Sequence, residues 1–355
     1  MRILHIGPKN YPPAHGGVEK VVYDIASGLE KAESHILVEW DQGEKDNIKI
    51  LPKGVLKQVK FILDYSKQKK ISVLHFHKEA FVFHAILATF LGHKTVVTIH
   101  GCPWRVKKWN IFYRFAFYIL DLLACLLVNE TVFVGKRDWR HFSRIFFWKK
   151  INFISNGITN TNEMCSGNTN ECVFIGRISV EKNVLELIKV FRDKKKNLTI
   201  YGPLDNHNED YGKKVIQEVQ KSENIKYGGV LPFSKVLPTL KQYNTFYNLS
   251  SSEGMPVAVL EAASIGMNLV LSDIPQHRNL GFSDVKYFGL RKIYKQKPPV
   301  FEGYSVSNKD HTNHQFAINK AIKKYESLYS KLAPKNKFGK VMDDVQPEGK
   351  TQKAC

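Results

Sequence analysis

The chain has 355 residues, 43% hydrophobic and 12% aromatic, so it is long enough to bury two cores of ordinary domain size. Lys and Arg number 53 against 33 Asp and Glu, and the formal net charge of +20 favours polyanionic partners such as nucleic acid, anionic lipid headgroups or phosphorylated substrates. The five cysteines show neither CxxC nor zinc spacing, which argues against a disulfide or zinc scaffold and favours free thiols in a reducing compartment.

Neither a signal peptide nor a membrane span is predicted. The apolar run within MRILHIGPKN is too short for a signal peptide, so we expect a cytosolic chain. The longest apolar stretch, residues 111–128, is interrupted by Arg114 and Asp121. A charged side chain at the centre of a bilayer costs about 2.5 to 3.5 kcal/mol on insertion scales, so this stretch is not expected to cross a membrane.

The first elements are a strand, a long loop and a helix. Residues 2–6 (RILHI) predict a buried strand, and the loop GPKNYPPAHGG leads to a helix that begins near Gly17, where apolar residues recur at helical spacing. The loop contains no GxGxxG, which argues against a dinucleotide-dependent dehydrogenase. Gly16 and Gly17 would let the backbone approach a ligand at the helix N-terminus. The alternative is a loop that merely needs positive φ.

Further α/β elements follow, and one ends in a histidine. They are a strand at residues 35–39, a basic helix at 55–69, a strand at 73–77, a buried helix at 80–91 and a strand at 95–99. The last strand runs into His100 and Gly101, so the histidine projects at the carboxyl edge of a sheet, where open α/β sheets bind ligands. His75, His77 and His84 are interpreted as core or rim residues without a role.

Residues 104–150 are rich in aromatic and basic side chains. In KRDWRHFSRIFFWKK, aromatic and basic residues fall on two helical faces: Trp139, Phe142 and Phe146 on one, Arg137, Arg140 and Arg144 on the other. Such a helix suits an anionic membrane surface, where each basic residue contributes about 1 kcal/mol. The alternative is a helix at a domain edge, with the aromatics in the core and the cations in solvent. Nucleic acid would also tolerate this composition, but no nucleic-acid-binding signature accompanies it.

The second half begins with a strand, a basic turn and a helix. A polar run at residues 159–170 precedes a strand at 171–175 and a helix at 184–191. Arg177 and Lys182 flank the turn that joins this strand to this helix, so both cations can reach one diphosphate. The alternative is that they are ordinary surface residues, as an isolated arginine and lysine usually are. A strand at 198–201 and a helix at 211–220 follow.

The segment FYNLSSSEGMPVAVLEAASIGMNLVLSDIPQHRN, residues 246–279, predicts a strand, a loop, a helix from Pro256 to about Ile265 and a second buried strand. Glu253 lies in the loop and Glu261 within the helix. Backbone N–H groups at the helix N-terminus favour an anion, whereas carboxylates suit hydroxyl groups, and a sugar nucleotide carries both. The alternative is that Glu253 caps the helix and Glu261 is solvated.

EGMPVAVLE resembles the paired-glutamate motif of the retaining glycosyltransferases of family 4, and ASIGMNLVLSD follows it in the order typical of that family. Other segments resemble the same family: GGVE, VVTIHG, the junction ISNGI with Ser155 in place of the usual proline, and GRISVEKN. The resemblance extends from Arg2 to Asn279 and is weakest between residues 43 and 68. It implies the GT-B fold, in which two Rossmann-like α/β domains with parallel sheets face each other across a cleft.

The resemblance also implies roles for individual residues. The expected catalytic residues are His100, Arg177, Lys182 and Glu253. The expected donor-binding residues are Gly16, Gly17, Gly254, Met255, Pro256, Val257 and Glu261. No cofactor or metal is expected, because no DxD motif lies in a suitable loop and Asp205 is only a weak metal candidate.

These segments divide the chain into an acceptor-side domain at residues 1–155 and a nucleotide-sugar-binding domain at 156–312 that is abbreviated after 280. A terminal helix at 313–332 would cross back to the first domain, before a disordered tail at 333–355.

We expect a metal-independent, retaining hexosyltransferase that uses a nucleotide sugar and acts on a lipid-linked or cell-envelope glycan of the lipopolysaccharide, O-antigen or capsule type. It would be cytoplasmic and peripheral, on the anionic inner face of the cell membrane. Two alternatives stay open: a catalytically inactive scaffold with the same fold, motivated by the abbreviated C-terminal region, and a basic nucleic-acid-binding protein, although no nucleic acid partner is expected.

Overall fold

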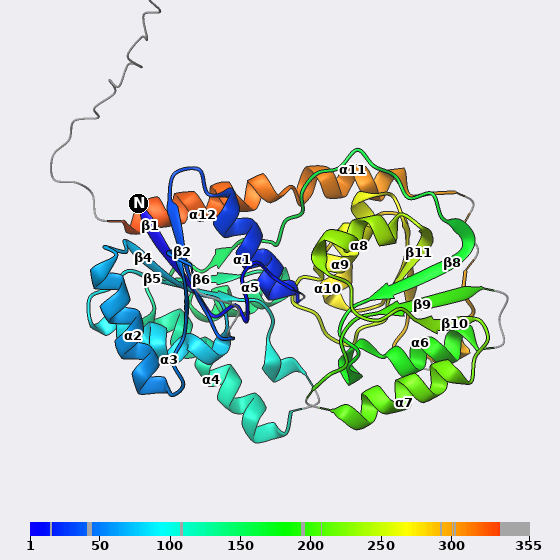
Figure 1. The fold of residues 1–355 in the computed structure, drawn as a ribbon, viewed down its shortest axis with the longest axis horizontal. Helices are drawn as coiled ribbons and strands as arrows, with labels where there is room; N and C mark the ends of the chain where they lie inside the picture. Colours follow the sequence, from blue (N-terminus) through cyan, green and yellow to red (C-terminus); the bar gives the residue numbers. More distant parts are fainter. Residues whose placement is uncertain are drawn as a thin grey trace, which may run out of the picture.

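The computed structural model describes residues 1–333 except 15, 41–44, 107–108, 193–195, 207, 292, 300 and 302. The predicted tail therefore lies outside the described residues beyond Ala333. The chain forms two separate sheets of parallel strands, one from each half of the sequence, and the last helix lies along the first half (Figure 1).

The first sheet has seven strands in the order β3-β2-β1-β4-β5-β6-β7. Its strands are β1 (Arg2–Ile6), β2 (Glu33–Val38), β3 (Ile48–Ile50), β4 (Val73–Phe76), β5 (Thr95–Ile99), β6 (Glu130–Phe133) and β7 (Asn152–Phe153). Its helices are α1 (Gly17–Gly28), α2 (Val55–Gln68), α3 (Val82–Phe90), α4 (Ile111–Leu127) and α5 (Lys136–Ile145), with short 3-10 turns η1 (Glu79–Phe81) and η2 (Pro103–Arg105). Helices α2 to α5 cover one face of the sheet, and α1 covers the other.

The second sheet has six strands in the order β10-β9-β8-β11-β12-β13. Its strands are β8 (Asn168–Ile175), β9 (Asn197–Tyr201), β10 (Ile225–Tyr227), β11 (Tyr243–Asn248), β12 (Asn268–Ser272) and β13 (Val285–Phe288). Its helices are α6 (Val184–Phe191), α7 (Glu209–Gln220), α8 (Phe233–Leu240), α9 (Val257–Ser264) and α10 (Pro275–Arg278), with 3-10 turns η3 (Val180–Lys182) and η4 (Ile293–Lys295). Helices α6 and α7 pack on one face, and α8 and α9 on the other.

The chain crosses between the two halves twice, and the crossings are hydrogen-bonded to each other. Ile158 N donates to Phe316 O (2.8 Å), and Ile318 N donates to Ile158 O (2.8 Å). A Cβ on Gly157 would lie 2.6 Å from Ile318 Cα, so only glycine allows this approach. The continuous helix predicted over residues 313–332 is consequently broken at Phe316 and Ala317, and the structure has α11 (Val306–Gln315) and α12 (Ile318–Leu332) instead.

Helix α12 packs on the same face of the first sheet as α1. Its Tyr325 and Tyr329 are buried among Ile3, Val73 and Val96 of that sheet. Figure 1 shows α11 and α12 running along one edge of the molecule, from the second half to the first. The end of the chain thus contributes to the core of the domain with which the chain begins.

The predictions about membrane contact concern helices α4 and α5. Among the described residues, no helix is long and apolar enough to cross a membrane. In α5 the aromatic and basic faces separate as predicted, but Phe142 and the following Phe146 are buried in the core. For these two side chains the structure agrees with the alternative interpretation, a helix at a domain edge with its aromatics in the core, because the helix uses this face to cover the sheet.

Candidate active site between the two domains

The two domains meet where the loop before α9 touches the end of β5. A Cβ on Gly254 would lie 1.8 Å from the carbonyl oxygen of His100, so no residue other than glycine fits at this contact. Asn156, in the junction between the domains, donates from Nδ2 to the carbonyl oxygen of Met255 (3.2 Å). The residues predicted at His100 and at 254–255 therefore come together, although they belong to different sheets.

Glu253 is held by a polar network and does not cap α9. Its Oε1 accepts hydrogen bonds from Lys182 Nζ (2.5 Å), Ser250 Oγ (2.6 Å) and Asn248 Nδ2 (3.2 Å). Only 9% of its side chain is exposed. Burial alone would raise the pKa of Glu253, but the charges of Lys182 and His277 and the bonds from Lys182 and Ser250 outweigh it and lower that pKa. Glu253 is thus a carboxylate fixed in position, and its capping role in the alternative interpretation is wrong.

Lys182 and Arg177 lie on the loop between β8 and α6, and their environments differ. The loop is fixed to the end of β11, because Asn183 Nδ2 donates to Leu249 O (2.7 Å) and Ser251 N donates to Glu181 O (2.8 Å). This anchoring brings Lys182 to Glu253. Arg177 is exposed, and within the described part of the chain it has no hydrogen bond or ion pair. Of the two predicted cations, Lys182 is therefore paired with Glu253, and Arg177 is available to bind an anion.

Glu261 faces the first domain from within α9, and it is 7% exposed. Its interpretation as a solvated helix residue is wrong. Burial raises the pKa of Glu261 to about 7; the charge of Lys20 opposes this rise and that of Asp24 adds to it. Lys20 Nζ donates to Asp24 Oδ2 (2.6 Å), so an ion pair of α1 lies beside this carboxyl group. No pattern in the sequence predicts that Lys20 lies next to Glu261.

Among the residues that the structure describes, no side chain caps the N-terminus of α9. The helix begins at Val257, one residue later than predicted, and Pro256 occupies the N-cap position. Val257 is buried with residues of the first sheet and α12, which ties this end of α9 to the first domain. Val259 N and Leu260 N donate to Pro256 O, and no described side chain accepts from the first two N–H groups of the helix, those of Val257 and Ala258, so these two are available to an anion.

Gly16 is the N-cap of α1 and Gly17 is its first residue, and both are exposed. Gly16 adopts φ 109°, and a Cβ on Gly17 would meet nothing within 4 Å. Glu19 behind them is buried, and its Oε1 accepts from Lys9 N (3.3 Å) and lies 3.7 Å from Lys78 Nζ. Glu19 therefore anchors its own loop and fills the space beside Gly16, where a Cβ would lie 2.3 Å from Glu19 Oε2, while Gly17 leaves open backbone at the start of the helix.

His100 continues into a row of buried histidines. Its Nε2 lies 3.4 Å from His77 Nδ1, and His77 Nε2 lies 3.0 Å from His5 Nδ1. Burial, with a smaller effect of Lys78, lowers the pKa of His100 to about 3. The ring is therefore neutral near pH 7 and can offer a hydrogen bond to an uncharged ligand group.

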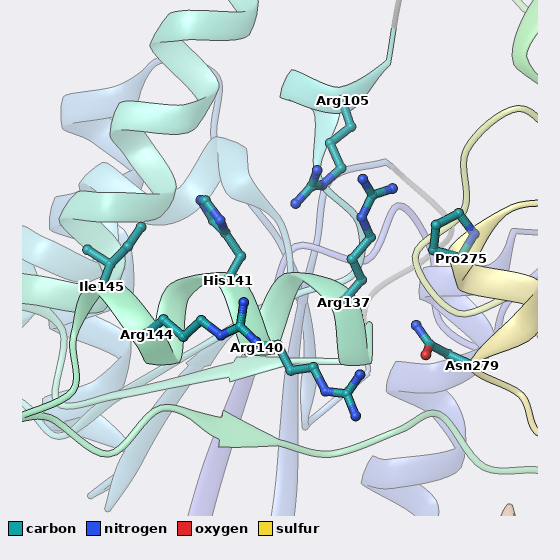
Figure 2. A pocket seen from close by; sticks show the side chains of 8 residues that line it. All are labelled: Arg105, Arg137, Arg140, His141, Arg144, Ile145, Pro275 and Asn279. Carbon is teal, nitrogen blue, oxygen red and sulfur yellow. The ribbon is translucent and has the colours of Figure 1, made fainter.

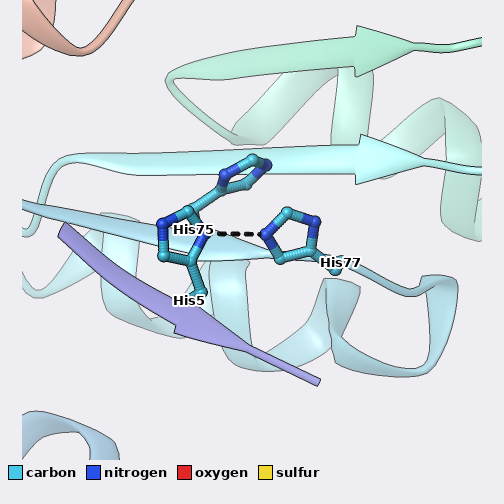
Figure 3. A group of neighbouring side chains, drawn as sticks. All are labelled: His5, His75 and His77. Carbon is cyan, nitrogen blue, oxygen red and sulfur yellow. Dashed lines mark hydrogen bonds between the residues drawn. The ribbon is translucent and has the colours of Figure 1, made fainter. Parts of the chain in front are cut away.

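His5, His75 and His77 could in principle share a metal ion, because their ligand atoms lie within 4.8 Å of one another (Figure 3). However, His75 Nδ1 is 2.6 Å from Tyr329 Oη and its Nε2 is 2.7 Å from Thr98 Oγ1. A metal would have to replace one of these bonds. The hydrogen bonds fit the interpretation of His75 and His77 as core residues better than they fit a metal site.

A cavity of about 600 Å³ opens between α5 and α10, near the contact of Gly254 with His100. Four arginines, Arg105, Arg137, Arg140 and Arg144, line it from the first domain, and Pro275 and Asn279 line it from the second (Figure 2). Arg137 and Asn279 also border a small hollow lined by Gly254 and Met255. The helical spacing of three of these arginines was visible in the sequence, but the opposing domain that turns them into a cavity was not.

Two family profiles match consecutive parts of the chain. The profile described as Glycosyltransferase Family 4 matches residues 15–161, and the profile described as Glycosyl transferases group 1 matches residues 164–280.

Individual relatives are distant but cover most of the chain. A GDP-mannose:cellobiosyl-diphosphopolyprenol alpha-mannosyltransferase of Xanthomonas oryzae pv. oryzae is 23% identical over 302 residues, which are 78% of this chain and 79% of that protein. The capsular polysaccharide biosynthesis glycosyltransferase CapH of Staphylococcus aureus is 26% identical over 286 residues, 74% of this chain and 78% of that protein. Sucrose-phosphate synthase of Thermosynechococcus elongatus superposes with a TM-score of 0.77 at 11% identity, over 93% of this chain and 98% of that chain. Our chain is therefore a glycosyltransferase of the family 4 type, with the GT-B fold.

Proposed function

We propose that the protein is a retaining, metal-independent hexosyltransferase that transfers a sugar from a nucleotide sugar to a lipid-linked or cell-envelope glycan. The observation that carries this proposal is the contact of Gly254 with His100 beside the fixed pair of Glu253 and Lys182. A donor bound at this contact would touch both domains at once.

The second domain would bind the donor diphosphate. Arg177, Lys182 and the uncapped N-terminus of α9 would stabilise the negative charge that grows on the diphosphate as the glycosidic bond breaks. The acceptor oxygen would bond to the anomeric carbon on the same face from which the diphosphate departs, and the hydroxyl proton would pass to the departing phosphate oxygen. Lys182 Nζ donates a hydrogen bond to Glu253 Oε1, so Glu253 would hold the ammonium group in place for the donor.

The carboxylates would accept hydrogen bonds from donor hydroxyl groups. Glu253 suits this role because its lowered pKa keeps it ionised. Glu261 would bind the ribose, and the neutral ring of His100 would contact the transferred sugar from the first domain. Gly16 and Gly17 would allow the loop before α1 to approach the phosphates. None of these roles needs a metal, and Asp205, the weak metal candidate, is buried.

The names of the relatives support an acceptor of the cell envelope: one acts on a diphosphopolyprenol-linked glycan and another belongs to capsule biosynthesis. A peripheral position on the membrane is supported by exposed apolar side chains on α4 and after α5. They include Phe112 and Phe147, each 82% exposed, together with Ile111, Phe115 and Trp148. With a net charge of +20, such a surface would favour anionic lipids.

The proposal is tested by a hydrolysis screen without acceptor. We expect slow cleavage of one sugar among UDP-, GDP-, ADP- and dTDP-linked donors, unaffected by EDTA. The released sugar should first appear, by proton NMR, as the anomer present in the donor. Glu253→Gln should lower the rate at least tenfold, whereas Lys214→Ala, which removes an exposed charge on α7, should not. Cleavage of no donor, or equal rates for wild type and Glu253→Gln, would contradict the proposal.

A further inference from the structure

The arginine cavity, lined by Arg105, Arg137, Arg140 and Arg144, concentrates positive charge between the two domains. Arg105 is stacked on Trp104 (4.0 Å to the ring centroid), and its Nε donates to the buried Asp138 (2.6 Å). The other three arginines have no hydrogen bond or ion pair with any residue that the structure describes. Guanidinium groups stay charged at any ordinary pH, so these three exposed arginines can still bind an anion.

The fold itself assembles this charge. Arg137, Arg140 and Arg144 recur at helical spacing on α5, and Arg105 comes from η2 at the end of β5. Figure 2 shows the side chains of Arg105 and Arg137 reaching toward each other from these two elements. Several guanidinium forks around one space match the oxygens of a phosphate or diphosphate, which they bind bidentately.

We infer that the arginine cavity binds the diphosphate group of a lipid-linked glycan acceptor, an inference that rests on the proposed function. The donor diphosphate is assigned to Arg177 and Lys182, and neither lines this cavity. The cavity adjoins the donor loop through Arg137, which also borders the hollow at Gly254 and Met255. An anion held there would lie beside the donor, on the side of the first domain.

The surroundings of α5 provide a place for the lipid as well. Arg144 lies in the last turn of the helix, and the exposed Phe147 and Trp148 come three and four residues after it. A diphosphate in the cavity could therefore continue into an apolar chain on one side and into the glycan on the other. The concave shape, with walls from two domains, suits a single diphosphate better than the many headgroups of a flat membrane.

The inference is tested by measuring the binding of inorganic pyrophosphate with isothermal titration calorimetry. All proteins carry Arg177→Ala and Lys182→Ala, which removes the cations assigned to the donor. Adding Arg140→Gln and Arg144→Gln should raise the dissociation constant at least tenfold. The matched control Lys214→Gln with Arg291→Gln removes the same number of exposed charges from the second domain and should change it less than twofold. Equal weakening in both would mean unspecific attraction and would overturn the inference.

A second set of ligands separates the sources of the anion. With Arg177 and Lys182 intact, geranyl diphosphate should lose affinity when Arg140→Gln and Arg144→Gln are introduced, whereas flotation on phosphatidylglycerol vesicles should change little. Loss of flotation with unchanged affinity for both diphosphates would assign the arginines to membrane headgroups and overturn the inference. If no donor is hydrolysed but the titrations succeed, the proposed function falls and the anion site stands. If hydrolysis succeeds and the titrations fail, only the arginine cavity loses its role.

Discussion

Replacing Glu261 with glutamine should stabilise the free protein and weaken its binding of the donor. Glu261 has a pKa of about 7 in the folded protein against 4.5 for an ordinary glutamate. Because the raised pKa means that the folded state favours the protonated carboxyl, the stability from this group is complete below about pH 4.5 and lost as the pH rises to about 7. At about 1.36 kcal/mol per pKa unit, the ionised group costs the folded protein about 3 kcal/mol above pH 7.

Glutamine has the same shape and no charge, so Glu261→Gln should remove this cost. At pH 8 the free energy of unfolding in urea should exceed that of wild type by up to about 3 kcal/mol, and near pH 5 most of the difference should vanish. Glu223→Gln, at an exposed position, is the control and should change little at either pH. Donor binding should weaken by about 1 to 3 kcal/mol, because the amide replaces by an NH2 group one of the two acceptor oxygens that the ribose hydroxyls would use. Equal differences at both pH values would refute the burial argument, and unchanged donor affinity would refute the ribose role.

Three further predictions concern the leaving group, the membrane and the junction. Arg177→Ala and Lys182→Ala should each lower kcat for donor cleavage, because the charge they neutralise grows as the bond breaks; an increase in KM alone would speak against this role. Phe112→Ser with Phe115→Ser should reduce flotation on anionic vesicles, whereas Leu56→Ser, at an exposed position on α2, should not; equal flotation would exclude α4 as the docking surface. Gly157→Ala should destabilise the protein by about 1 to 3 kcal/mol in thermal or urea unfolding, because the added carbon meets the backbone of Ile318 at 2.6 Å; wild-type stability would show that the crossings can separate freely.

The strand, helix and strand around the paired-glutamate motif could be predicted almost completely. Residues 246–273 form β11, α9 and β12 in the predicted order, because proline, glycine and the apolar runs mark their boundaries locally. The partners of Glu253 could not be predicted, since Lys182 is 71 residues away in the sequence. Whether a carboxylate is free, capping or fixed depends on such distant contacts.

Some of the elements that were not predicted are short or depend on contacts with distant residues. Strands β3 and β7 have three and two residues, too few for a periodic pattern. The break between α11 and α12 follows from the hydrogen bonds of Ile158, which cannot be read from the helical pattern of residues 313–332. Likewise the two faces of α5 were visible in the sequence, but only packing decides that its aromatics face the core and its arginines face a cavity.

The central claim is that one donor contacts both domains, and a double-mutant cycle across the domain contact tests it most directly. His100 comes from the first domain and Lys182 from the second. With His100→Ala, Lys182→Ala and the double variant, kcat/KM for donor hydrolysis gives the interaction free energy of the two side chains. If both contact the same sugar diphosphate, the effects should differ from additivity by about 0.5 to 3 kcal/mol. Effects that add within about 0.3 to 0.5 kcal/mol would mean that the two residues act independently, which would contradict a shared donor site.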